Sequence, residues 1–299
     1  IKYYFPEIKG ESKEQYLQFF KAVADKTREM ILHWQRVGFV HGVMNTDNMS
    51  IHGITIDYGP YGWLENYDPN WTPNTTDSQY RRYRFGNQPQ IAQWNLYQLA
   101  NALYPLINEA EPLEKILESF MIDFESDYKN MFLSKLGLFI STETDNTLID
   151  GLETVLQLSE TDMTIFFRNL SSVQKSDSPE KAIERIQDSF YIPEQISGTI
   201  LESWQKWFTL YLERLHTEVL SDKERSEKMN TINPKYVLRN YMAQLAIDAA
   251  DQEDYSLIDE LYQLLQKPYD EQPEFQKWFA KRPDWARSKV GCSMLSCSS

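Results

Sequence analysis

The chain has 299 residues, enough for one large domain or two modest ones with a substantial buried core. Its 30 basic and 44 acidic side chains give a net charge of −14, which disfavours nucleic acids and anionic membranes as partners. The 15 Phe, 8 Trp and 18 Tyr exclude a disordered chain. Because no apolar run approaches the ~18 residues of a membrane span, we expect no membrane association.

The first strong element is a helix. Apolar residues recur at helical spacing from Leu17 to Trp34, and Gly38 is a typical stop. The segment 39–60 is short and β-like, and 66–90 is polar without clear periodicity, which is typical of a functional loop. The chain begins with Ile1 rather than Met, so we expect a fragment of a longer protein.

The remainder of the chain is predicted to be helical. Asn233 followed by Pro234 predicts a helix start, and Ser171 to Ser178 is the best candidate for an internal linker. The fold class is therefore mainly α with one small β-hairpin. The expected helices cover 91–103, 113–136, 147–158, 161–170, 179–190, 194–220, 234–250 and 255–266.

The β-like segment predicts a tight hairpin. Met49–Ile51 and Ile54–Ile56 are two β-prone runs joined by the two residues His52 and Gly53. In that register Asn48 lies opposite Asp57, with Cβ atoms about 5 Å apart, so an amide oxygen and a carboxylate can bind one Mg²⁺ or Mn²⁺. Asp47 is the neighbouring carboxylate.

The spacing around this site is typical of phosphoryl-transfer enzymes of the kinase type. His41 and Asn48 keep the spacing of the kinase catalytic loop, and Asp57-Tyr58-Gly59 stands where kinases have Asp-Phe-Gly. Val43 occupies the position of the kinase base, so ordinary kinase chemistry is disfavoured unless Asp47 serves instead. The glycines form no Gly-x-Gly and none precedes a lysine, which excludes the other common phosphate-binding loops.

At these residues the chain resembles the selenoprotein O family, which includes the bacterial YdiU-like proteins. The likeness covers the strings Gly38–Ile51, Thr55–Pro60, Phe85–Pro89, Trp94–Leu96, Asn233–Tyr241 and Cys297–Ser299. The resemblance implies a pseudokinase fold that binds ATP in a flipped orientation and transfers AMP to protein hydroxyls. It implies that Asp47 accepts the hydroxyl proton and that Asn48 and Asp57 bind Mg²⁺ or Mn²⁺. A cysteine before Ser-Ser is typical of bacterial members. Because the chain has only two cysteines and opens without a leader pattern, we expect a cytoplasmic protein (mitochondrial if eukaryotic).

Two features depart from the family pattern. The family's N-lobe, with its lysine and phosphate-binding arginines, has no counterpart here, so residues 1–299 are expected to be a kinase-like C-lobe with a helical extension. Alone it should bind nucleotide weakly and be inactive, because one cation would balance the whole ATP charge. The segment after Asp57 also lacks the cysteine of some relatives, which leaves Cys292 and Cys297 as the candidate redox pair.

The sequence therefore predicts a metal-dependent protein adenylyltransferase with ATP and protein substrates. Two alternatives stay open: a kinase-type phosphotransferase, which Val43 disfavours, and a non-catalytic pseudokinase scaffold. The preferred metal, the protein substrate and the oligomeric state are not encoded in any recognisable pattern.

Overall fold

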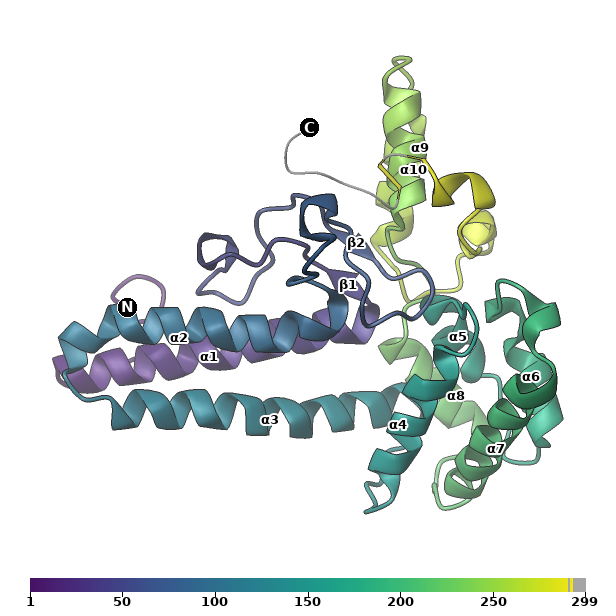
Figure 1. Cartoon of the computed structure of the whole chain (residues 1–299), viewed down its shortest axis with the longest axis horizontal. Helices are drawn as coiled ribbons and strands as arrows, with labels where there is room; N and C mark the ends of the chain where they lie inside the picture. Colours follow the sequence, from purple (N-terminus) through teal and green to yellow (C-terminus); the bar gives the residue numbers. More distant parts are fainter. Residues whose placement is uncertain (290, 293–299) are drawn as a thin grey trace.

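Residues 1–289 and 291–292 are described by the computed structural model. Three long helices, α1 (Ser12–Val37), α2 (Gln88–Ile107) and α3 (Glu111–Lys135), lie side by side (Figure 1). Helix α1 ends where Gly38 takes a left-handed conformation and its N–H bonds to the carbonyl of Trp34, as its sequence predicts. Apolar side chains of the three helices form one continuous core.

A second group of helices packs beyond the far end of α3 (Figure 1). Its core is rich in aromatic side chains, with Trp204 and Phe208 fully buried and Trp207 stacked on Tyr211 at 5.1 Å. The same core contains the fully buried Val173, which lies between two of these helices in the predicted linker. The group consists of α4 (Asp145–Leu156), α5 (Met163–Leu170), α6 (Pro179–Ile186), α7 (Gly198–Leu215) and α8 (Asp222–Ile232).

The C-terminal pair, α9 (Asn240–Ala250) and α10 (Ser256–Leu265), projects from the rest of the molecule (Figure 1). A buried ion cluster connects its base to the core. Arg239 donates two hydrogen bonds to Asp162, of 2.7 and 2.9 Å, and a third to Glu65. Because the guanidinium satisfies two buried carboxylates at once, loss of Arg239 would leave two unpaired charges in the interior.

The predicted mainly helical class is confirmed, but one predicted helix start is wrong. Asn233 is the last residue of the turn that ends α8, and residues 234–239 are irregular. Its side chain is instead buried, donating to the carbonyl of Lys135 and accepting from the Lys135 ammonium. The helix preceding it, α8, begins with a capping box formed by Ser221 and Glu224.

The only sheet in the described part of the chain has two antiparallel strands, β1 (Phe39–Val40) and β2 (Gly62–Trp63). Phe39 pairs with Trp63 and Val40 with Gly62. This sheet closes the base of the loop 41–61, which carries the predicted site residues. None of the described helices combines the length and apolarity needed to cross a membrane.

Candidate active site

The predicted hairpin at 49–56 is wrong, although the chain does reverse there. The Gly53 N–H bonds to the Ser50 carbonyl at 3.3 Å and Gly53 has φ of 66°, but no strand is formed on either side. The second arm bonds elsewhere: Thr55 accepts a hydrogen bond of 2.9 Å from the Trp34 indole N–H, and the Ile56 carbonyl bonds to His41. Interactions with α1 and the loop therefore replace a ladder between the two arms.

His41 is the buried centre of the loop, with 1% of its surface exposed. Its Nε2 lies 2.8 Å from the Ile56 carbonyl and its Nδ1 lies 3.4 Å from the Val43 backbone nitrogen. A carbonyl accepts and an N–H donates, so we assign the neutral tautomer with hydrogen on Nε2. Burial lowers the pKa of His41, and the nearby Asp57 raises it to a smaller extent, so the neutral form is favoured.

Asparagine side chains fix the three loop residues after His41. Asn48 was predicted from the sequence as a metal ligand, and its backbone-positioning role, like those of Asn74 and Asn95, was missed. The available signal was an amide at position 95 on a largely apolar face of α2. Three successive carbonyls each accept one amide N–H: Gly42 from Asn74 at 3.1 Å, Val43 from Asn48 at 3.0 Å, and Met44 from Asn95 at 3.0 Å.

Gln88, the first residue of α2, was also missed. Its side chain is fully buried and continues the pattern of the sheet, because its oxygen accepts from the His41 backbone N–H at 3.0 Å. Its amide nitrogen donates to the Phe39 carbonyl at 2.9 Å. The loop is thus attached to α2 at both Gln88 and Asn95, which makes it a rigid support for the exposed groups beside it.

The predicted chemical groups lie on this support. Asp47 is exposed within the short 3-10 helix Thr46–Asn48, and Asn48 is half-buried. The Asn48 amide nitrogen is committed to the Val43 carbonyl, so its oxygen remains available as an acceptor. Asp57 is exposed, with φ of 55°, and its charge acts on His41. Asn48 thus bonds to Val43, and Asp57 acts electrostatically on His41, so each is related to a different residue of the loop, and the predicted cross-strand register between them is absent.

The donor set fits a cation that arrives with phosphate. Among the described residues no group of three or more His, Cys, Asp or Glu side chains could hold a metal ion. One amide oxygen and one or two carboxylates are too few for a closed protein site. They are sufficient for Mg²⁺ or Mn²⁺ when the remaining ligands are water and substrate phosphate oxygens, as Mg²⁺ ordinarily takes in nucleotide enzymes.

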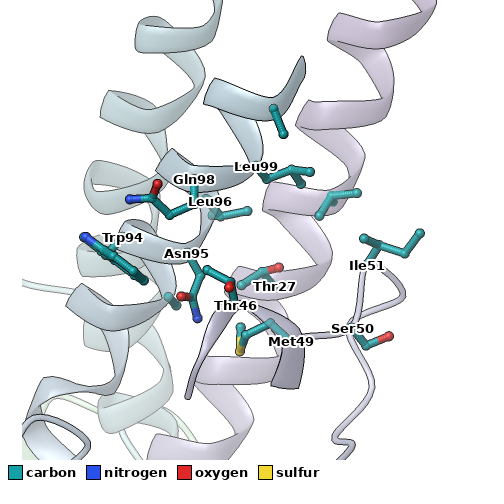
Figure 2. A pocket seen from close by; sticks show the side chains of 13 residues that line it. Thr27, Thr46, Met49, Ser50, Ile51, Trp94, Asn95, Leu96, Gln98 and Leu99 are labelled. Carbon is teal, nitrogen blue, oxygen red and sulfur yellow. The ribbon is translucent and has the colours of Figure 1, made fainter. Parts of the chain in front are cut away.

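A pocket of about 460 Å³ is lined by residues of α1, of α2 and of the segment 46–51, which includes part of the 3-10 helix (Figure 2). Its walls are mostly apolar, including Met49, Leu96 and Leu99. Asn95 and Thr46 both line the pocket and lie near each other in this view. The side-chain oxygen of Asn95 is buried and has no hydrogen-bond partner among the described residues.

Only one of the two cysteines lies within the residues that the structure describes. Cys292 is 4% exposed, packs in the core of the C-terminal helix pair, and is a free thiol whose pKa is raised by burial. Cys297 lies outside the described residues. The proposed redox pair therefore stays a prediction.

Comparison with known proteins identifies the family. The sequence model of a family described as "Protein adenylyltransferase SelO" matches residues 1–266. Two similar curated relatives are both described as "Protein nucleotidyltransferase YdiU". The one from Flavobacterium johnsoniae is 82% identical over 299 residues, covering 100% of this chain and 57% of the relative. The one from Rhodopirellula baltica is 50% identical over 291 residues, covering 94% of this chain and 54% of the relative.

The molecule is thus a mainly helical chain. Its small sheet carries a polar loop whose backbone carbonyls are hydrogen-bonded by asparagine side chains. The molecule belongs to the SelO family of protein adenylyltransferases, which confirms the family resemblance found in the sequence. The chain spans about half the length of the curated relatives it matches.

Proposed function

We propose that this chain is the metal-binding and proton-accepting part of a protein adenylyltransferase. ATP is the donor, a Ser, Thr or Tyr hydroxyl of a protein is the acceptor, and pyrophosphate leaves as the hydroxyl oxygen bonds to the α-phosphorus. The observation that carries the proposal is the match to the adenylyltransferase family over residues 1–266, which includes the whole loop 41–61.

The loop residues have separate roles in this proposal. Asn48 and Asp57 would hold Mg²⁺ or Mn²⁺, which when bound offsets charge on the phosphates. Asp47 accepts the hydroxyl proton, since it is exposed on the same short helix as Asn48. His41 and the three asparagines act as positioning residues, because they hold the backbone between these groups.

The second candidate enzymatic reaction is transfer of the γ-phosphoryl group of ATP. It is weaker because Val43, at the position of a kinase base, has no group that takes up a proton. The alternative outside enzymes is a non-catalytic scaffold protein. It requires no proton acceptor at Asp47.

ATP labelled at either the α or the γ phosphate distinguishes the three. Because the chain spans 57% of the F. johnsoniae relative, the assay compares the chain alone with the chain joined to the remaining segment of that relative. We expect label from the α position on protein in the joined form, with Mg²⁺ or Mn²⁺ present, and its loss in Asp47→Asn. Label from the γ position would indicate phosphorylation, and no label from either would indicate a scaffold.

A further inference from the structure

A second pocket, of about 310 Å³, lies where α1, α2, α3 and α4 approach the polar segment that follows the active-site loop. We refer to it as the aromatic-acid pocket, because four aromatic side chains and two carboxylates line it: Tyr67, Phe85, Phe124, Tyr128, Glu125 and Glu153. No lysine or arginine lines it. Its volume is at the lower end of ordinary small-ligand sites.

Two phenol hydroxyls hold the Glu153 side chain in place. Tyr67 donates to its Oε1 at 2.7 Å and Tyr128 donates to the same oxygen at 2.8 Å. Burial first, and the Glu153 charge next to it, raise the pKa of Tyr67 well above its usual value, so that phenol remains a donor. Neither Glu153 nor Glu125 forms an ion pair with any residue that the structure describes, and the second Glu153 oxygen has no described partner.

The aromatic walls are arranged in two pairs. The Tyr67 and Phe85 rings are 6.3 Å apart edge to face, and the Phe124 and Tyr128 rings are 5.8 Å apart. Aromatic walls with adjacent carboxylates attract an organic cation, through ring quadrupoles and through charge. A bare divalent ion is a poor fit, because the phenols are donors rather than ligands and most of the lining is apolar. An anion is repelled by both carboxylates and by the net charge of −14.

We infer that the aromatic-acid pocket binds the guanidinium side chain of an arginine presented by a polypeptide, with Glu153 and Glu125 as its counter-charges. Guanidinium suits this lining better than ammonium, because it is planar, stacks on aromatic rings and bonds to carboxylates with two N–H groups. The inference rests on the proposed function in one respect, that the acceptor is a protein.

The location supports a substrate-recognition role. Tyr83 donates a 2.5 Å hydrogen bond to Asn45 in the active-site loop, and Phe85, two residues later, lines the pocket. Two residues of chain span at most roughly 7 Å between Cα atoms. The pocket is therefore connected to the active-site loop through the segment 83–85.

The test is direct binding without ATP or metal, so that its outcome is independent of the labelled-ATP assay. Methionine methyl groups of the chain are labelled with ¹³C, and the Met121 signal reports on the pocket that it lines. N-acetyl-arginine amide is titrated against N-acetyl-citrulline amide, which has nearly the same shape without the charge. We expect a saturable shift of the Met121 signal with the arginine probe. The citrulline probe should bind at least roughly fivefold more weakly.

Matched variants complete the test. Glu153→Gln keeps an acceptor for both phenols and should weaken the arginine response roughly fivefold. Glu118→Gln removes the same charge from an exposed position on α3 outside the pocket and should leave the response unchanged. Thermal melting checks that both variants fold. An absent shift, an equal response to citrulline, or an unchanged response in a folded Glu153→Gln protein would each overturn the inference.

Discussion

At the scale of single residues, the candidate site depends on hydrogen bonds that orient its side chains. The sequence identifies these residues but does not show how they are oriented. Asn48, Asp47 and Asp57 can be proposed as site residues from their spacing around His41, because motif spacing is visible in the linear sequence. The supporting amides of Asn74, Asn95 and Gln88 are not recognisable, because each lies on a different segment and acts only when folding brings it to a particular carbonyl.

His41 gives a pH prediction at this scale. Its pKa is lowered by burial, so the stability that its neutral form contributes is present above the ordinary histidine value near 6.5 and is lost as pH falls through the lowered value. We expect the free energy of unfolding to fall as the pH decreases from 7 to 5.5. In His41→Gln, which cannot titrate, urea denaturation should show a smaller decrease over that range.

His33 provides the comparison for this experiment. Partial desolvation and the neighbouring Arg36 lower its pKa, but its side chain is exposed on α1 and bonds to Arg36 rather than to the loop. His33→Gln should therefore reduce the pH slope without altering the binding of nucleotide and metal. If His41→Gln retained the full slope of the unmodified chain, the assignment of a buried neutral His41 would be wrong.

At the scale of elements, long periodic helices are well predicted and short β structure is not. Helices α1 and α3 agree closely with their predicted bounds, because the apolar residues of each recur at helical spacing over several turns. The two-residue strands β1 and β2 carry no periodic signal. The runs 49–51 and 54–56 do have β-prone residues, yet Ile51 and Ile54 are exposed and the arms bond to other elements.

The turn at Gly42 gives a prediction at the scale of the loop. Gly42 has φ of 80°, and a Cβ atom there would lie 2.2 Å from the Pro60 carbonyl oxygen. Gly42→Ala should therefore destabilise the chain by about 2 kcal/mol or more and displace the loop from its support. Chemical denaturation measures the loss.

Gly59→Ala is the matched control, because a Cβ atom at Gly59 meets nothing within 4 Å. Its free energy of unfolding should change by no more than about 0.5 kcal/mol. Equal stability of the two variants would show that the close approach of Gly42 to Pro60 does not constrain the loop.

At the scale of the whole molecule, charge and packing act together. A net charge of −14 favours cationic partners and opposes nucleotide unless a metal ion is present. The sequence predicts the helical class and the family, but not how distant segments meet, such as Arg239 with Asp162 and Glu65. Such clusters are invisible in sequence because ion pairs carry no local periodicity.

We propose that Asn48 and Asp57 bind one cation that brings the nucleotide. The most direct measurement is calorimetric titration of ATP with Mn²⁺ into the chain joined to the remaining segment of its relative, comparing Asp57→Asn with the control Asp150→Asn on α4. Asparagine tolerates the left-handed backbone at 57, so this variant removes the charge without strain. We predict that Asp57→Asn weakens Mn²⁺-dependent ATP binding roughly tenfold or more, while Asp150→Asn leaves it unchanged. Equal affinity in a folded Asp57→Asn protein would contradict the account.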